Sequence, residues 1–289
     1  MKLGGERGLP RPHLPPGIHL PQGAWWHRRA EEAPPRDPNE QVVVARGLHK
    51  TLGSKVVLDD VSFQAREGET LVVLGRSGTG KSVLLRHITG LMNPDRGSMR
   101  VLGSEISELH RTELYALRLQ VGVLFQGAAL LDSMNVYDNV TLGLRSHTQL
   151  PEEELHRIAD EKLEAVGLRG IGDMMPSELS GGMRKRVGLA RAIAMNPSLI
   201  LYDEPTTGLD PVMADVINDL ILRLGRAPHI TSIVVTHDMT SAFKVGTHFV
   251  MIHGGHVLFD GDADQLRNCP DPRVAGFIAG RGAALELLR

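Results

Sequence analysis

The residues from Gly75 to Ser82 form the pattern Gly-x-x-x-x-Gly-Lys-Ser, which is typical of a loop that binds polyphosphate. In full the loop is Gly75, Arg76, Ser77, Gly78, Thr79, Gly80, Lys81 and Ser82. Glycine lets successive backbone N–H groups turn inward around an anion. We expect Lys81 to place its charge on the β- and γ-phosphates and the Ser82 hydroxyl to bind Mg²⁺. The spacing therefore predicts a site for a nucleoside triphosphate.

Three further apolar runs end in polar side chains that suit hydrolysis of such a substrate: Gln126, the pair Asp203 and Glu204, and His237. We expect Asp203 to hold Mg²⁺ and Glu204 to polarise the attacking water as general base. We expect Gln126 to orient that water and touch the metal. We expect His237 to hydrogen-bond the γ-phosphate and Glu204. Phosphoryl transfer has a loose transition state, so positioning and charge stabilisation would supply most of the catalysis.

Each of these side chains also has a structural interpretation when it is taken alone. Paired carboxylates after a strand often cap a helix, and a single histidine is more often structural than catalytic. The set is what favours hydrolysis, because ligands of an open α/β sheet bind beyond the carboxyl ends of its strands.

The elements that must position these residues follow from hydrophobic periodicity. A short apolar run at 70–74 predicts a buried strand before the phosphate loop, and residues 83–88 predict a helix after it. We predict further strands at residues 41–45, 56–58, 61–63, 101–103, 121–125, 199–202, 233–236, 249–252 and 257–259. Helices are expected within 127–186, at 180–195, after Pro211 and at 271–280. The pattern predicts an α/β fold with a parallel core sheet and a small antiparallel β region ahead of the phosphate-loop strand.

Composition narrows the class of protein. The chain has 289 residues and a formal net charge of −2, and no basic stripe interleaved with aromatics suggests nucleic-acid binding. Its single cysteine, Cys269, excludes an internal disulfide. No apolar run approaches the roughly 20 residues that a transmembrane helix needs. We therefore expect a cytoplasmic protein whose membrane role, if any, comes through a partner.

Residues 1–38 differ from the rest, because proline recurs among glycine, arginine and histidine. Such a density of proline opposes helices and sheet ladders, so we predict a disordered, proline-rich tail. Trp25 and Trp26 in this tail suggest either a docking patch or part of an unstructured leader.

Two more motifs complete a resemblance to the ATP-binding-cassette (ABC) ATPases. Leu179-Ser180-Gly181-Gly182-Met183 resembles the signature motif of that family, and Gly208-Leu209-Asp210 resembles its D-loop. The order of phosphate loop, Gln126, signature, carboxylate pair, Asp210 and His237 is also that of the family. The resemblance implies an ABC-type P-loop NTPase at 39–289, with a RecA-like parallel core sheet and an N-terminal antiparallel β subdomain. It also implies an inserted helical subdomain at about 127–187 and a C-terminal helix at about 271–281.

The resemblance further implies that ATP and Mg²⁺ are bound and that two copies form a head-to-tail homodimer. Ser180, Gly181, Gly182, Met183 and Asp210 would then contact the nucleotide held by the other subunit. Ser180 begins a helix, and a helix N-terminus favours anions.

Two positions depart from the family pattern. Met183 stands where the signature usually ends in glutamine, and it has no strong hydrogen bond to offer a ribose. Leu52 stands where an aromatic residue usually stacks on adenine, so its contact would be apolar only.

Residues 124–140, 145–151, 175–178 and 270–274, together with Met183, resemble the ATPases of maintenance-of-lipid-asymmetry (Mla) transporters. Those ATPases serve permeases that work with mammalian-cell-entry (MCE) domain proteins in phospholipid transport. The resemblance implies a permease whose coupling helix docks beside Gln126. An apolar coupling helix needs apolar contacts, for which Leu130, Leu131 and Met134 are the candidates, and the alternative is that these side chains pack within the helical subdomain. It also implies a STAS-domain partner and a peripheral place on the inner face of the cell membrane.

Two alternatives share the catalytic motifs. One is an importer ATPase for a polar solute such as an amino acid. The other is a soluble ABC ATPase that does not serve transport, although such proteins usually carry two cassettes or a long coiled coil, and this chain has neither.

Overall fold

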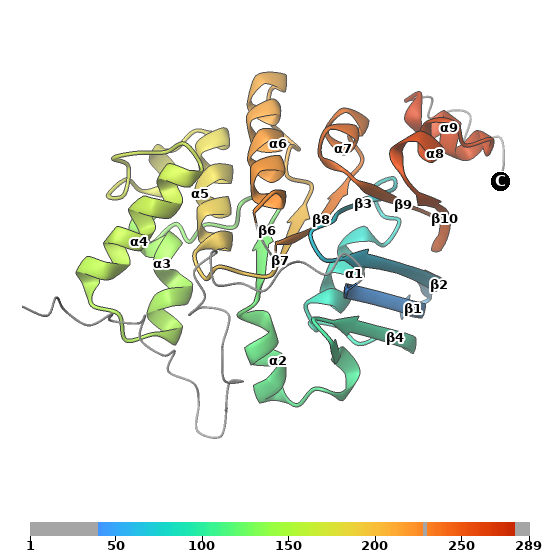
Figure 1. Cartoon of the computed structure of the whole chain (residues 1–289), viewed down its shortest axis with the longest axis horizontal. Helices are drawn as coiled ribbons and strands as arrows, with labels where there is room; N and C mark the ends of the chain where they lie inside the picture. The colour runs from blue at the N-terminus through green and yellow to red at the C-terminus, as the bar shows by residue number, and fades with distance from the viewer. Residues whose placement is uncertain (1–39, 228–229, 281–289) are drawn as a thin grey trace, which may run out of the picture.

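The computed structural model describes residues 40–227 and 230–280, so the predictions for the proline-rich tail and for residue 281 lie outside the described residues. A six-stranded sheet with the order β10-β9-β3-β8-β7-β6 runs through the middle of the molecule (Figure 1). Its strands are β3 (Thr70–Leu74), β6 (Val121–Leu124), β7 (Leu199–Asp203), β8 (Thr231–Thr236), β9 (His248–His253) and β10 (His256–Gly261). Neighbouring strands from β9 to β6 are parallel, and β10 pairs antiparallel with β9.

Alternate residues of the central strands face two separate cores. In β3, Leu71 and Val73 face one core, whereas Val72 and Leu74 face the other. Such two-sided burial explains why these strands appear in the sequence as continuous apolar runs. Strand β6 differs: it is the edge strand, so its two valines are half-buried rather than buried as the continuous run predicted.

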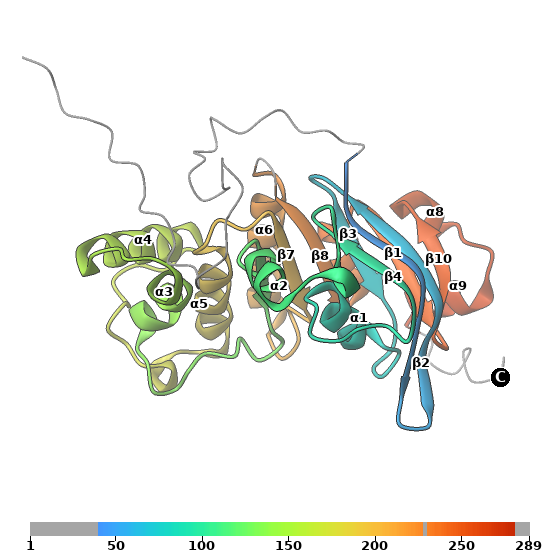
Figure 2. The ribbon, with the colours of Figure 1, turned by 90° about the horizontal axis from the view of Figure 1, so that it is seen from below.

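A second, antiparallel sheet with the order β2-β1-β4-β5 covers one face of the first (Figure 2). Its strands are β1 (Gln41–Leu52), β2 (Lys55–Arg66), β4 (Arg96–Val101) and β5 (Ser104–Glu105). The core between the two sheets also receives apolar side chains from α1 (Lys81–Ile88) and α2 (Arg111–Arg118). The N-terminal antiparallel region that the sequence predicted is therefore a packed layer of its own.

Helices cover the opposite face of the parallel sheet and extend beyond it at one end (Figure 1). They are α3 (Val136–His147), α4 (Glu152–Ala165), α5 (Gly181–Ile193), α6 (Pro211–Gly225), α7 (Met239–Val245), α8 (Ala263–Arg267) and α9 (Pro272–Ile278). Helices α3, α4 and α5 pack together at the end of the molecule remote from β1 and β2. No helix in the part of the chain that the structure describes has the length and apolar character needed to span a bilayer.

Side-chain caps fix where the helices next to the sheet edge begin. Ser180 accepts a hydrogen bond from the backbone N–H of Met183 at the start of α5. Asp210 accepts two from the first turn of α6, and Asp238 accepts two from the first turn of α7. Because a cap satisfies N–H groups that lack helical partners, it sets the direction in which a helix leaves its loop.

Candidate active site

The predicted chemical groups follow four adjacent strands of the parallel sheet. The phosphate loop follows β3, His237 follows β8, the pair Asp203 and Glu204 ends and follows β7, and Gln126 comes two residues after β6. Since these strands are parallel neighbours, their carboxyl ends lie along one edge. The topology thus brings residues that are far apart in the sequence to one side of the molecule.

The phosphate loop is held by its own lysine. Lys81 is buried, and its Nζ donates to the carbonyl oxygens of Gly75 at 2.7 Å and Arg76 at 3.0 Å. Burial lowers the pKa of this ammonium, and the nearby Glu204 carboxylate partly offsets that effect. The lysine charge is therefore held inside the loop, at the N-terminus of α1, where an anion is favoured.

Gly80 is required by the path of the loop. Its φ of 98° lies in a region that residues with side chains rarely adopt. A Cβ at this position would also lie 3.0 Å from the carbonyl oxygen of Val57 and 2.9 Å from a methyl group of Leu58. Strand β2 therefore borders the phosphate loop, and Val57 is a neighbour that the sequence pattern did not single out.

Glu204 lies at the centre of the site. One carboxylate oxygen, Oε1, is 3.5 Å from the Lys81 ammonium. The other, Oε2, accepts hydrogen bonds from His237 Nδ1 at 2.8 Å, Thr207 at 3.2 Å and Thr236 at 3.5 Å. Such a carboxylate is fixed in direction by its donors while its neighbour His237 stays half-exposed. The arrangement can orient a water molecule and take a proton from it.

Asp203 lies beside the phosphate loop in a less satisfied environment. Its Oδ2 accepts a long hydrogen bond of 3.5 Å from Ser82, and its Oδ1 is buried without a hydrogen-bond partner among the residues that the structure describes. Burial, with Glu204 next in the chain, raises the pKa of the carboxyl. A buried oxygen with no donor is costly, and a bound cation would satisfy it. The hydroxyl and the carboxylate are ligands that Mg²⁺ accepts, so the residues present fit this ion.

Gln126 and Leu52, the other candidates of the nucleotide site, have fewer contacts that support their predicted roles. Gln126 is exposed, and the structure gives its side chain no hydrogen bond to any residue it describes. Leu52 is the last residue of β1, exposed next to the hairpin turn at Gly53. No hydrogen bond in the described part of the chain joins Gln126 to the phosphate loop, and Leu52 can offer only apolar contact, so their predicted roles stay predictions.

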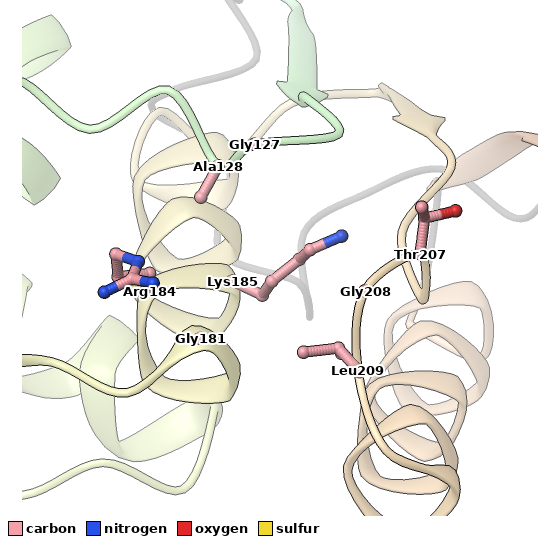
Figure 3. Close-up of a pocket in the computed structure, with 8 residues that line it drawn as sticks. All are labelled: Gly127, Ala128, Gly181, Arg184, Lys185, Thr207, Gly208 and Leu209. Carbon is pink, nitrogen blue, oxygen red and sulfur yellow. The ribbon is translucent and has the colours of Figure 1, made fainter.

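Gly181 of the signature and Gly208 and Leu209 of the D-loop line a separate cavity of about 170 Å³ (Figure 3). The residues that line it come from the segment after Gln126, from α5, and from the D-loop and the residue before it: Gly127, Ala128, Gly181, Arg184, Lys185, Thr207, Gly208 and Leu209. Ser180 and Asp210 are exposed and cap α5 and α6, and Met183 packs against the core instead of pointing freely outward. Ser180 makes no hydrogen bond to the phosphate loop of its own chain among the residues described.

Sequence reasoning missed Lys185. It is buried, and its Nζ donates to the carbonyl oxygens of Glu204 at 3.2 Å and Pro205 at 2.8 Å. Burial lowers the pKa of this ammonium as well. A signal was present, because Gly182, Lys185 and Leu189 follow the i, i+3, i+7 spacing of a buried helix face. A lysine on such a face needs a polar partner inside the protein.

Comparison with known proteins decides the family. The ABC transporter family matches residues 58–207, which include the phosphate loop, the signature and the carboxylate pair. The chain belongs to the ABC transporter family. The MlaF protein of Haemophilus influenzae, described as an intermembrane phospholipid transport system ATP-binding protein, is 41% identical over 242 residues, which cover 84% of this chain and 92% of MlaF.

A second relative is described with a different transported substrate, and a solved structure shares the fold. A Mycobacterium leprae protein described as "Probable ribonucleotide transport ATP-binding protein mkl" is 42% identical over 246 residues, covering 85% of this ABC protein and 71% of mkl. A dimeric, post-hydrolysis structure of the ATP-binding cassette MJ0796 with ADP and Pi has a TM-score of 0.70 and 30% identity, and the match covers 76% of this chain and 98% of MJ0796. This ABC protein is therefore an ATPase built on the same cassette fold, as the sequence predicted.

Proposed function

We propose that Glu204 is the general base of ATP hydrolysis. The observation that supports it is its position between the Lys81 ammonium at 3.5 Å and His237 Nδ1 at 2.8 Å. In this arrangement Lys81 binds the β- and γ-phosphates, and the phosphate loop surrounds them with backbone N–H groups. Glu204 accepts the proton of the attacking water, and His237 keeps the carboxylate oriented while its exposed ring contacts the γ-phosphate. Gln126 orients the same water from the end of β6.

Ser82 and Asp203 would hold Mg²⁺, with Gln126 as a further ligand. The buried Oδ1 of Asp203, which has no hydrogen-bond partner in the described part of the chain, supports a cation beside this carboxylate. Bound there, the ion would neutralise charge on the phosphates. The residues Ser82 and Asp203 hold it next to the loop because β3 and β7 end at the same edge of the sheet.

The active unit is a homodimer in which Ser180 of one subunit faces the nucleotide of the other. Gly181 and Gly182 open α5, so their N–H groups precede the first helical hydrogen bonds and are available to an anion. Ser180 and Gly181 are exposed in the single chain. Met183 and Asp210 belong to the same trans contact, and the dimeric MJ0796 cassette is the precedent for such an arrangement.

The ATPase drives a membrane permease that moves phospholipid between membranes, on the inner face of the cell membrane. The observation that carries this proposal is the identity to MlaF, which extends over 92% of that protein. MCE-domain and STAS-domain proteins are the further partners of this system, as the sequence resemblance implied.

The permease docks beside Gln126, where the structure separates the three candidate contacts. Leu130 packs against the core, Met134 is half-buried, and Leu131 exposes 41% of its surface. Asn139 holds this loop from within: its Oδ1 accepts from the N–H of Leu131 at 2.8 Å, and its amide donates to the carbonyl of Leu131 at 3.1 Å. Leu131 therefore offers an apolar side chain on a fixed backbone, as a docking contact requires.

The test is reconstitution. The full chain would be purified with its membrane complex, and the lipids that co-purify would be identified. The complex would then be placed in donor vesicles that contain labelled phospholipid. We expect ATP-dependent movement of the label that stops in the Glu204→Gln variant. Transport of a polar solute without phospholipid would contradict the lipid proposal and leave the ATPase assignment intact.

A polar-solute transporter is the second candidate, because the mkl relative is equally similar in sequence and is described in terms of ribonucleotides. The same vesicles loaded with labelled ribonucleotide or amino acid separate the two. ATP-dependent uptake of either solute would favour this second function.

A further inference from the structure

Lys185 is a lysine inside the protein, and the two hydrogen-bond partners that it has among the described residues are backbone groups. Only 5% of its surface is exposed. Its Nζ donates to the carbonyl oxygens of Glu204 and Pro205, the two residues that follow β7. Figure 3 shows the side chain crossing from α5 toward the loop that leads to Thr207. A buried ammonium is costly unless it is well paired, so this interaction fixes the distance between α5 and that loop.

The turn that Lys185 holds has an uncommon backbone conformation. Glu204 has a φ of 48°, in the left-handed region that residues with side chains rarely adopt. Its N–H donates to Val235 of β8 at 2.9 Å, and its carbonyl accepts from Thr207 at 3.2 Å as well as from Lys185. Such a conformation persists only when its surroundings impose it, and it is common at active sites. The direction of the Glu204 side chain depends on these backbone contacts.

Helix α5 holds a second left-handed segment in the same way. Arg191 donates to the carbonyl oxygens of Ala128 and Ala129, both at 2.7 Å. These two alanines have φ values of 63° and 49° and follow Gln126 by two and three residues. One helix thus carries Ser180 at its N-terminus, Lys185 behind Glu204, and Arg191 behind the segment after Gln126.

We propose that Lys185 is a positioning residue for hydrolysis: it holds the left-handed turn at Glu204 and so couples the direction of that carboxylate to the position of α5. The proposal rests on the proposed role of Glu204 as base. A shift of α5, whose first turn faces the partner's nucleotide, changes the Glu204 turn through this lysine. Contact of α5 with the partner's nucleotide and orientation of the Glu204 carboxylate then depend on the same movement of one rigid helix.

The first test compares Lys185→Met with wild type in the full-length protein. Methionine keeps most of the length and apolar character but donates no hydrogen bond. We expect kcat to fall about a hundred-fold with KM for ATP within about two-fold, because a misplacement of the base by about 1 Å has that effect. Lys185→Gln keeps two donors at a reach one bond shorter, so its kcat should fall only about ten-fold. Wild-type kcat in folded Lys185→Met overturns the proposal.

A matched control separates positioning from stability. Lys162 of α4 is also a largely buried lysine, and it donates to Glu161 and to Asn196 far from the site. Lys162→Met should leave kcat unchanged per folded molecule, as measured beside circular dichroism. If Lys185→Met does not fold, Lys185→Gln decides alone, and wild-type kcat in that variant overturns the proposal.

A double-mutant cycle then tests the route through Glu204. If Lys185 acts by aiming this carboxylate, Lys185→Met should change the residual rate of Glu204→Gln by less than about two-fold. A loss in that background as large as in wild type overturns the inference. Wild-type turnover in Glu204→Gln itself would overturn the base assignment and the inference with it, so the two failures are distinguishable.

Discussion

Replacing Glu204 with glutamine changes the site by one atom, and the structure indicates how the amide would lie. Oε1 of the carboxylate faces the Lys81 ammonium at 3.5 Å, and a donor cannot face another donor there. The amide oxygen therefore keeps that place, and the NH₂ group takes the place of Oε2. There it meets Thr207, Thr236 and His237 Nδ1, each of which can accept a hydrogen bond after a hydroxyl rotation or a change of tautomer.

The expected effect on catalysis is large and the effect on binding is small. Loss of a general base costs about 10²–10⁴-fold in rate, which corresponds to about 2.7–5.4 kcal/mol of activation free energy. Lys81 keeps its bonds to the carbonyl oxygens of Gly75 and Arg76, so the phosphate loop stays in place. Removing the neighbouring negative charge also frees the Lys81 ammonium for phosphate. We expect the Kd for ATP to stay within about three-fold of wild type, or to tighten.

The assay combines single-turnover phosphate release, titration with a fluorescent ATP analogue, and gel filtration with ATP. The variant should bind ATP, hydrolyse it slowly, and elute with the mass of a dimer. Glu153→Gln, an exposed glutamate at the start of α4, is the matched control and should hydrolyse ATP as wild type does. A Glu204→Gln protein that turns over ATP near the wild-type rate would refute the reasoning.

Three further changes test the rest of the site. Lys81→Ala should weaken ATP binding by about ten- to hundred-fold, since a charge-assisted hydrogen bond contributes about 1.5–3 kcal/mol; an unchanged Kd in calorimetry would contradict it. Leu52→Tyr should tighten binding by about 1 kcal/mol if the base stacks there, and no change would instead point to Val57, which borders Gly80. Leu131→Asp should lower permease association and lipid transport without affecting ATP binding, because it alters an exposed side chain on a loop fixed by Asn139; normal assembly and transport would place the docking groove elsewhere.

The sequence was sufficient to predict the parallel strands and the polar groups at their carboxyl ends, because the central strands are buried on both faces. Residues 70–74 and 199–202 are continuous apolar runs for that reason, and each ends where a polar group must emerge. The same logic failed at β6, because an apolar run cannot reveal that its strand lies at the edge of the sheet. Helices α2, α7 and α8 were not predicted, since eight, seven and five residues are too few for a clear helical period and no motif marks their starts as the phosphate loop marks the start of α1.

The residues that position the catalytic side chains, such as Lys185, could not be predicted from the sequence for a different reason. Motifs identify the groups that touch a ligand, but the residues that aim those groups bind backbone carbonyls, and a backbone carbonyl has no sequence signal. The left-handed φ of Glu204 and of Ala128 appears at residues that usually avoid that region, so composition gives no warning of it. Only the burial of Lys185 could have been predicted from the sequence, because its spacing places it on the buried face of α5.

The position of Lys185 on α5 suggests how the two nucleotide sites of a dimer can act together. In the proposed dimer the first turn of α5 faces the partner's nucleotide, while Lys185, five residues along, holds the Glu204 turn of its own chain. Five residues of α-helix span only about 7.5 Å, so the two ends of this connection move as one body. A chain whose partner carries no nucleotide lacks the anion at Ser180 that would fix α5, and its own base is then less firmly aimed. Hydrolysis at one site would therefore depend on whether the other site holds a nucleotide, and the first turns of α5 would be enough to couple the two sites.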